Sequence, residues 1–400
     1  MSGPIVGVVA EYNPFHKGHL HHLKTIRESL CADVVIVVLS SYFTQRGEPA
    51  VCSPVSRSKM ALLGGADIVI QLPSAFSCQN AGIFASAAVD LLAATGIVSH
   101  ISFGMETPEQ DMTQILDILI HEPDAFKTAL RRFLDEGHSF PKARSLALRA
   151  ACSADESFFS GSNDILALEY AKRIAERRYP IRLFPVQRTG SPHRSVSPES
   201  GMPSAGALRK ALFLRDSPED IRHGVPEFAY DILVEEGRTG RICSSSERLW
   251  RVTQIILSRE TPESLRAFAG ISEGIENRIL QEKEGAGSFE ALVPACPPRR
   301  SPRRRIRRTL LHILLGLTQA ANLRFQQSGP QYIRILGYTE EGRKALARMR
   351  RTAALPLLSR WSYRKNAAER DLLDFEQRSS ILWEALLPSP AFGEIRKEHP

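Results

Sequence analysis

Hydrophobic residues in the first half of the chain alternate between short continuous runs and wider helical stripes. Five runs are apolar on both faces and rich in β-branched residues, over 5–9, 33–39, 67–73, 100–104 and 181–186. Such runs predict strands that are buried on both sides. Between them, apolar residues recur at helical spacing over 20–30, 56–63, 81–94 and 164–175. Strands alternating with helices predict an α/β fold with a Rossmann-like, doubly wound parallel sheet.

The second half of the chain has a different pattern. Helical spacing dominates over 219–235, 245–258, 262–268, 305–317 and 340–351, and 331–338 is typical of a lone strand. A chain of 400 residues is long enough for two cores. We therefore predict an α/β domain over residues 1–216 and a mostly α-helical C-terminal domain over 217–400, with no internal repeat.

Composition narrows the class of protein. A hydrophobic fraction of 43% is ordinary for a globular chain and excludes a disordered one. No apolar run approaches the roughly eighteen residues of a membrane span, and the N-terminus lacks a secretory signal pattern. The six cysteines are scattered without a C-x-x-C pair, which predicts reduced thiols and no zinc site. These features predict a cytoplasmic protein that has no membrane partner and no protein-bound metal.

Positive charge is concentrated late in the chain. The net charge is +8, and residues 299–308 contain seven arginines and no acid, which would attract a nucleic-acid backbone. Because 305–317 predicts a helix with an apolar underside, the arginines predicted to contact RNA are Arg303, Arg304, Arg307 and Arg308. The alternative is a solvated surface or linker. A second basic patch with aromatic residues could stack a base or pin the C-terminal core; it comprises Arg360, Trp361, Tyr363, Arg364 and Lys365.

The stretch VVAEYNPFHKGHLHHL, residues 8–23, carries the strongest chemical signal. A strand, a loop and a helix that begins near Gly18 expose unpaired amides and a positive helix end to an anion. His16 and His19 are three residues apart, so both imidazoles could hold the charge that develops on a phosphorus during in-line displacement. A metal pair or a solvated helix surface are the alternatives, but no third metal ligand with suitable spacing is nearby.

The segment GVVAEYNPFHKGHL resembles the first signature of the HIGH-motif nucleotidyltransferases and, in its fuller form, the bacterial tRNA(Met) cytidine acetate ligase family. Further similar stretches follow in order over 41–50, 65–73, 103–107, 162–174, 186–190, 305–317 and 335–346. The resemblance implies an ATP-dependent ligase that uses Mg²⁺. Acetate would attack the α-phosphate to give acetyl adenylate, and the acetyl group would pass to the exocyclic amine of the wobble cytidine of elongator tRNA(Met), giving N4-acetylcytidine.

The same resemblance implies the site residues. His16 and His19 would be catalytic, and ATP would contact Gly104, Asn163, Arg188 and the loop over 7–20. That loop comprises Gly7, Val8, Val9, Ala10, Glu11, Tyr12, Asn13, Pro14, Phe15, His16, Lys17, Gly18, His19 and Leu20. From the residues alone, the favoured interpretations are a turn glycine for Gly104, a helix cap for Asn163 and a surface charge for Arg188.

The loop after the second strand, QRGEPA, lies where open α/β folds bind ligands. Gln45 and Arg46 are candidates for contact with acetate or tRNA, whereas Gly47 and Pro49 shape a turn in the alternative interpretation. The sequence therefore does not decide between a functional and a structural role for this loop.

The chain departs from the family pattern at several positions. The second nucleotide signature is usually Ser-Ala-Thr-x-x-Arg; here SAGALR keeps Ser204 and Arg209 as possible phosphate contacts and places Gly206 where a hydroxyl is expected. An expected lysine is Pro54, although Arg57 remains, and the expected aromatic and acidic residues near position 193 are Pro192 and Arg194. Two other functions therefore stay open: a nucleotidyltransferase that moves AMP or CMP onto a phosphorylated metabolite, and a non-catalytic RNA-binding relative.

Overall fold

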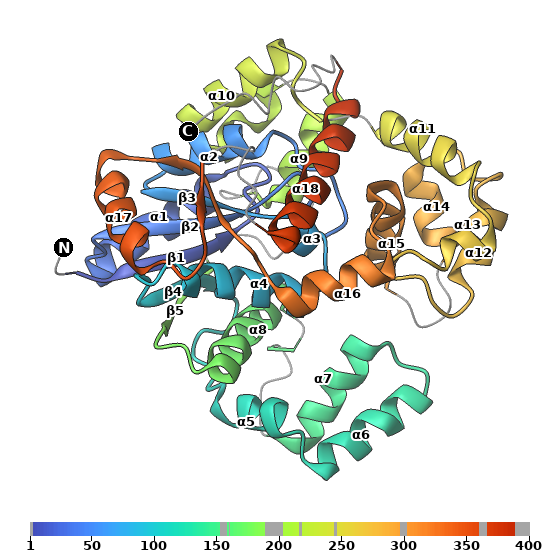
Figure 1. Ribbon diagram of the computed structural model, residues 1–400, viewed down its shortest axis with the longest axis horizontal. Helices are drawn as coiled ribbons and strands as arrows, with labels where there is room; N and C mark the ends of the chain where they lie inside the picture. Colours follow the sequence, from blue (N-terminus) through green and yellow to red (C-terminus); the bar gives the residue numbers. More distant parts are fainter. Residues whose placement is uncertain are drawn as a thin grey trace.

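A computed structural model describes residues 3–152, 158–159, 161–188, 203–215, 218–243, 246–296, 302–359 and 366–388. At its centre is a seven-stranded sheet in the order β5-β4-β1-β2-β3-β6-β7 (Figure 1). Five strands run parallel; they are β1 (Ile5–Ala10), β2 (Val34–Ser40), β3 (Ile68–Leu72), β4 (His100–Met105) and β5 (Arg182–Gln187). The predicted doubly wound α/β fold is confirmed. Because the strand order reverses at β1, ligands are expected at the carboxyl end of this strand.

Helices cover both faces of the sheet. Along β2, Val35 and Val37 belong to one core, whereas Ile36 and Val38 belong to the other. This alternation follows from the two-residue period of a strand. One face is covered by α1 (Lys17–Leu30) and α2 (Pro54–Leu63), and the other by α4 (Ala81–Ala94) and α8 (Ser162–Arg177). The continuous apolar runs in the sequence are the consequence of this double coverage.

The C-terminal part of the chain returns to the same sheet. β6 (Ile333–Tyr338) pairs antiparallel with β3, and β7 (Leu357–Leu358) pairs with β6. The expectation that this strand stands alone is therefore wrong, because the buried backbone of β6 finds its partners on the open edge of β3. A division into 1–216 and 217–400 separates β6 from its sheet, and residues 216–217 at that boundary lie outside the described residues.

The last helix positions a loop on the N-terminal half. Helix α18 (Ala367–Ala385) packs against the short helix α3 (Ser74–Ser77), and α17 (Glu340–Thr352) follows β6. The Trp383 Nε1 group donates to the carbonyl of Ala50 at 2.7 Å, and the Ser74 amide donates to Glu376 Oε2 at 2.6 Å. The loop between β2 and α2 and the start of α3 are thus fastened by residues from the far end of the chain.

The remaining helices form three groups in Figure 1. The first group is α5 (Thr113–His121), α6 (Asp124–Asp135) and α7 (Phe140–Ala151), at the lower edge of the view. The second is α9 (Ala205–Arg215), η1 (Pro218–Gly224) and α10 (Glu227–Arg238), which pack together near α2. The third is α11 (Ser246–Leu257), α12 (Pro262–Leu265), α13 (Ile275–Glu282), α14 (Phe289–Ala295), α15 (Arg303–Leu315) and α16 (Gln319–Ser328). In the part of the chain that the structure describes, no helix is long and apolar enough to span a bilayer.

Candidate functional site

A cavity of about 480 Å³ opens at the carboxyl ends of β1, β4 and β5. Most of the predicted ATP contacts meet in its wall although they come from distant parts of the sequence. They are Val8, Val9, Ala10, Glu11, Tyr12, Asn13, His16, Gly18, His19, Gly104, Asn163 and Arg188, joined by Ser204 and Arg209. This is the edge at which doubly wound sheets bind their ligands.

Five residues of the predicted ATP loop do not line this cavity; they are Gly7, Pro14, Phe15, Lys17 and Leu20. A Cβ atom at Gly7 would lie 2.7 Å from the Leu92 side chain, so this glycine allows α4 to pack on β1. The Phe15 ring is buried against Tyr12 and Phe228, whereas the Lys17 side chain is exposed. The loop therefore contributes to the cavity wall only in part, because some of its side chains point into the core.

His16 and His19 are held by hydrogen bonds within their own turn. His16 caps α1: its Nδ1 atom accepts from the Gly18 amide at 3.0 Å, and the His16 amide donates to Nδ1 of His19 at 3.2 Å. The two rings stack with centroids 3.7 Å apart. Because each Nδ1 is an acceptor, each neutral ring carries its proton on Nε2. The pair therefore offers two Nε2–H donors to a ligand in the cavity.

Burial keeps these imidazoles neutral. It lowers the pKa of His16 to about 3, with further contributions from Arg188 and Arg209, and it lowers the pKa of His19 well below 6.5. It also lowers the pKa of His22 to about 4, and the Nε2 atom of His22 lies 2.8 Å from Ser102 Oγ. Bound phosphate would oppose this effect, because negative charge favours the protonated ring. The site is thus electrostatically prepared for an anion.

Gly18 is required by the geometry of the cap. A Cβ atom there would lie 2.9 Å from Cε1 of His16, closer than real Cβ contacts allow. The glycine therefore lets the capping imidazole fold over the first turn of α1, in addition to leaving the backbone open to a ligand.

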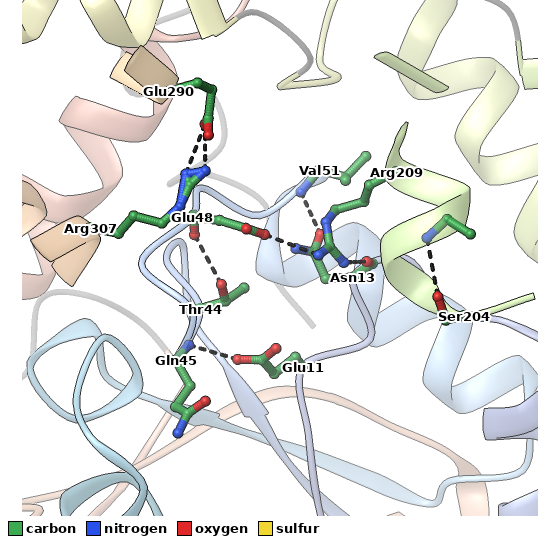
Figure 2. A network of polar contacts seen from close by, with 11 residues as sticks. Glu11, Asn13, Thr44, Gln45, Glu48, Val51, Ser204, Arg209, Glu290 and Arg307 are labelled. Carbon is green, nitrogen blue, oxygen red and sulfur yellow. Dashed lines mark hydrogen bonds and ion pairs between the residues drawn. The ribbon is translucent and has the colours of Figure 1, made fainter. Parts of the chain in front are cut away.

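Two arginines fix the loop that follows β1. Arg209 donates from Nη1 to the carbonyl of Asn13 at 2.7 Å and from Nη2 to Glu48 Oε2 at 3.0 Å (Figure 2). Arg57 is fully buried and donates from Nη1 to the carbonyls of Glu11 at 2.7 Å and Ser40 at 2.9 Å. Arg57 thus supports the backbone from the core, whereas Arg209 both supports the loop and lines the cavity.

Gly104, Asn163 and Arg188 are brought together beside the histidines. Gly104 lies within β4 rather than in a turn, and a Cβ atom there would lie 3.1 Å from Cγ of Arg188. Asn163 lies in the first turn of α8, whose N-cap is Gly161, and its Nδ2 donates to Glu106 Oε1 at 2.6 Å. The turn-glycine and helix-cap alternatives are therefore excluded for these positions.

The arginine cluster divides into members with different surroundings. Arg304 and Arg308 line the cavity, and Arg303 is exposed outside it. Arg307 is paired instead: its Nη1 lies 2.8 Å from Glu290 Oε1 (Figure 2). Gln45 and Arg46 also line the cavity. Outside the described residues lie Pro192, Arg194, Arg299, Arg300, Arg360, Trp361, Tyr363, Arg364 and Lys365.

Several lining residues escaped the sequence analysis, among them Asn80, Phe84 and Tyr170. Asn80 caps α4 and Phe84 lies in its first turn, whereas Tyr170 lies in the middle of α8. At these positions the sequence shows only an ordinary helix boundary and an apolar stripe. No local signal distinguishes them from residues of the core, because their place in the wall depends on how the helices pack.

Comparisons with known proteins cover nearly the whole chain. A family model described as HIGH Nucleotidyl Transferase matches residues 4–397. A tRNA(Met) cytidine acetate ligase from Syntrophomonas wolfei is 35% identical, over 97% of this chain and 96% of that protein. Another from Acetivibrio thermocellus is 34% identical over 98% of both. The crystal structures of Thermotoga maritima TmcAL, apo and bound with alpha-thio ATP, are 31% identical over 99% of both chains, with TM-scores of 0.91 and 0.89.

Proposed function

Because this chain belongs to the HIGH nucleotidyl transferase family and, within it, to the tRNA(Met) cytidine acetate ligases, we propose that it is an ATP-dependent ligase that acetylates the wobble cytidine of elongator tRNA(Met). The observation that carries the proposal is the locked pair of imidazoles at the start of α1, in a chain similar to these ligases along its whole length. The apolar and cationic cavity around that pair suits a nucleoside triphosphate.

The first step forms acetyl adenylate. A carboxylate oxygen of acetate attacks the α-phosphorus of ATP, the bond from that phosphorus to the bridging oxygen breaks, and pyrophosphate leaves. His16 and His19 donate from Nε2 to the phosphate oxygens on which charge builds. Arg188 and Arg209, whose charges act on the His16 ring, add positive potential.

The second step transfers the acetyl group. The exocyclic amine of the cytidine attacks the carbonyl carbon of acetyl adenylate, the bond from that carbon to the phosphate oxygen breaks, AMP leaves, and the amine releases a proton. A wobble cytidine is unpaired in its loop, so it reaches the cavity without disruption of a duplex. Arg303 and Arg304 contact the RNA backbone, and Arg308 contacts the RNA from the cavity wall. Arg307 contributes less because Glu290 already holds it.

Mg²⁺ would enter with the nucleotide and supply positive charge to its phosphates. The described residues include no group of three His, Cys, Asp or Glu side chains that could hold a metal ion. An ion of this kind would be bound mainly by phosphate oxygens and water, as Mg²⁺ commonly is. The ion would neutralise part of the triphosphate charge. We place the reaction in the cytoplasm, where both ATP and tRNA are present.

Incubation with ATP, Mg²⁺ and labelled acetate, with and without total bacterial tRNA, tests the proposal. We expect acetyl adenylate in both reactions and label in tRNA when it is present. Transfer of a nucleotide to a phosphorylated metabolite would instead support the small-molecule nucleotidyltransferase. Binding of RNA without turnover would support the non-catalytic relative.

A further inference from the structure

A carboxylate and a guanidinium, those of Glu11 and Arg308, both bind the backbone of Gln45 at the edge of the cavity. The Gln45 amide donates to Glu11 Oε1 at 2.7 Å, and the Gln45 carbonyl accepts from Arg308 Nη1 at 3.1 Å (Figure 2 shows the first contact). All three residues line the cavity. Gln45 therefore fixes a carboxylate and a guanidinium close together while each keeps hydrogen-bonding groups for a ligand.

The supports of this arrangement are rigid. The buried Arg57 donates from Nη1 to the Glu11 carbonyl at 2.7 Å. Tyr12, the next residue, has a left-handed φ of 44°. Gly47 has a φ of 75°, and a Cβ atom there would lie 2.8 Å from the Arg308 amide. The loop thus packs directly against the first turns of α15, which sets the position of the guanidinium relative to the carboxylate.

Neither side chain forms a salt bridge within the described residues, although the buried Arg57 guanidinium interacts electrostatically with Glu11. Among the described residues, no carboxylate forms an ion pair with Arg308 and no cation forms one with Glu11. Both charges act on the same buried neighbour: burial raises the pKa of the Cys78 thiol to about 12, and Arg308 and Glu11 shift it in opposite directions. Two half-buried charges without a salt-bridge partner are costly unless a ligand adds the missing contacts.

The Glu11 carboxylate and the Arg308 guanidinium together favour a ligand that has both a hydrogen-bond donor and acceptors. A triphosphate or an acetate offers only acceptors and would be repelled by Glu11. A cytosine offers a donating amine beside the acceptors N3 and O2, and an acidic side chain is the usual partner of that amine. Resting on the proposed function, we propose that Glu11 and Arg308, bridged by Gln45, form the subsite that recognises the target cytosine: Glu11 accepts from its exocyclic amine, and Arg308 donates to its ring acceptors.

Binding of two tRNA transcripts tests the subsite, one with cytidine and one with uridine at the wobble position. We expect the full chain to bind the cytidine form about tenfold more tightly, since a matched pair of this kind discriminates by roughly that factor. In Glu11→Gln the ratio should fall to about one. The new amide keeps an oxygen for the Gln45 amide, so the loop is retained, and an unchanged melting temperature checks this.

Glu48→Gln is the matched control, because Glu48 lies on the same loop but binds Arg209. It should keep the cytidine preference even if adenylate formation slows. A preference that persists in Glu11→Gln, or that is absent from the unaltered chain, would overturn the subsite. So would a higher Mg²⁺ requirement for adenylate formation in Glu11→Gln with the preference retained, because Glu11 would then be a metal ligand. Failure to form acetyl adenylate in the unaltered chain would instead reject the proposed function, independently of the binding ratio.

Discussion

The histidine end of the cavity and its Glu11 end differ in how far along the chain their supports lie. The bonds that fix the His16 and His19 rings join residues two and three positions apart. The bonds that fix Glu11 and Arg308 to Gln45 span 34 and 263 positions. A local device is visible in a short motif, whereas a long-range one depends on the packing of α15 and α18 beside the loop. We therefore expect the phosphate-binding end to survive changes in distant helices and the Glu11 end to be sensitive to them.

The largest effect should come from removing either imidazole. His16→Ala or His19→Ala is expected to slow acetyl adenylate formation by about two to three orders of magnitude, because each ring donates to the charge that develops on the phosphate. Binding of tRNA should stay within about twofold, which an equilibrium titration can measure. His121→Ala, an exposed position on α5, serves as the control. Equal loss of adenylate formation and tRNA binding would contradict the division between the two ends.

The pH dependence of stability tests whether the His16 ring is buried at the histidine end of the cavity. Because the His16 pKa falls from 6.5 to about 3 on folding, the unfolded chain binds more protons between these values. Stability should therefore fall as the pH drops below about 6.5 and be fully present above it. His16→Asn keeps a capping oxygen but does not titrate. The free energy of unfolding of this variant, measured in urea, should therefore change with pH less steeply, by at most about 1.4 kcal/mol per pH unit. Identical slopes for the two proteins would mean that the ring is not buried.

Two arginines of α15, Arg304 and Arg307, test how the tertiary surroundings of a side chain affect RNA binding. Arg304→Ala should reduce the slope of log affinity for tRNA against log salt by about one, since a free phosphate contact is lost. Arg307→Ala should change that slope less, because Glu290 already holds the Arg307 guanidinium. Affinity measured at several salt concentrations separates the two variants. Equal changes would show that the ion pair opens at no cost when RNA binds.

The smallest effect concerns Gly206 in the first turn of α9, beside the possible phosphate contacts Ser204 and Arg209. A Cβ atom at Gly206 would lie 3.8 Å from Ser204 Oγ and 4.0 Å from Arg209 Nη2, so a larger side chain fits there. Gly206→Thr should lower the KM for ATP by roughly two- to tenfold, the value of one added hydrogen bond. Gly206→Ala controls for helix propensity, which also improves when glycine is replaced. A similar KM in both variants would exclude a role for the hydroxyl.

The sequence by itself determined the alternation of strands and helices and the resemblance to the acetate ligase family, both of which are confirmed. It also placed a helix start near Gly18, and α1 begins at Lys17 with His16 as its cap. These features are local: a strand buried on both faces needs a continuous apolar run, and a cap needs its partners within one turn. The roles proposed for individual site residues stay predictions.

Only the tertiary structure decided which residues of the predicted loop reach the cavity, and that β6 joins the first sheet instead of a separate domain. It also separated Arg307, paired with Glu290, from Arg304 and Arg308, although one short run of sequence carries all three. The physical reason is that side-chain direction and long-range pairing depend on which surfaces pack together. Residues that are neighbours in sequence can lie against different partners, and no local pattern records that choice.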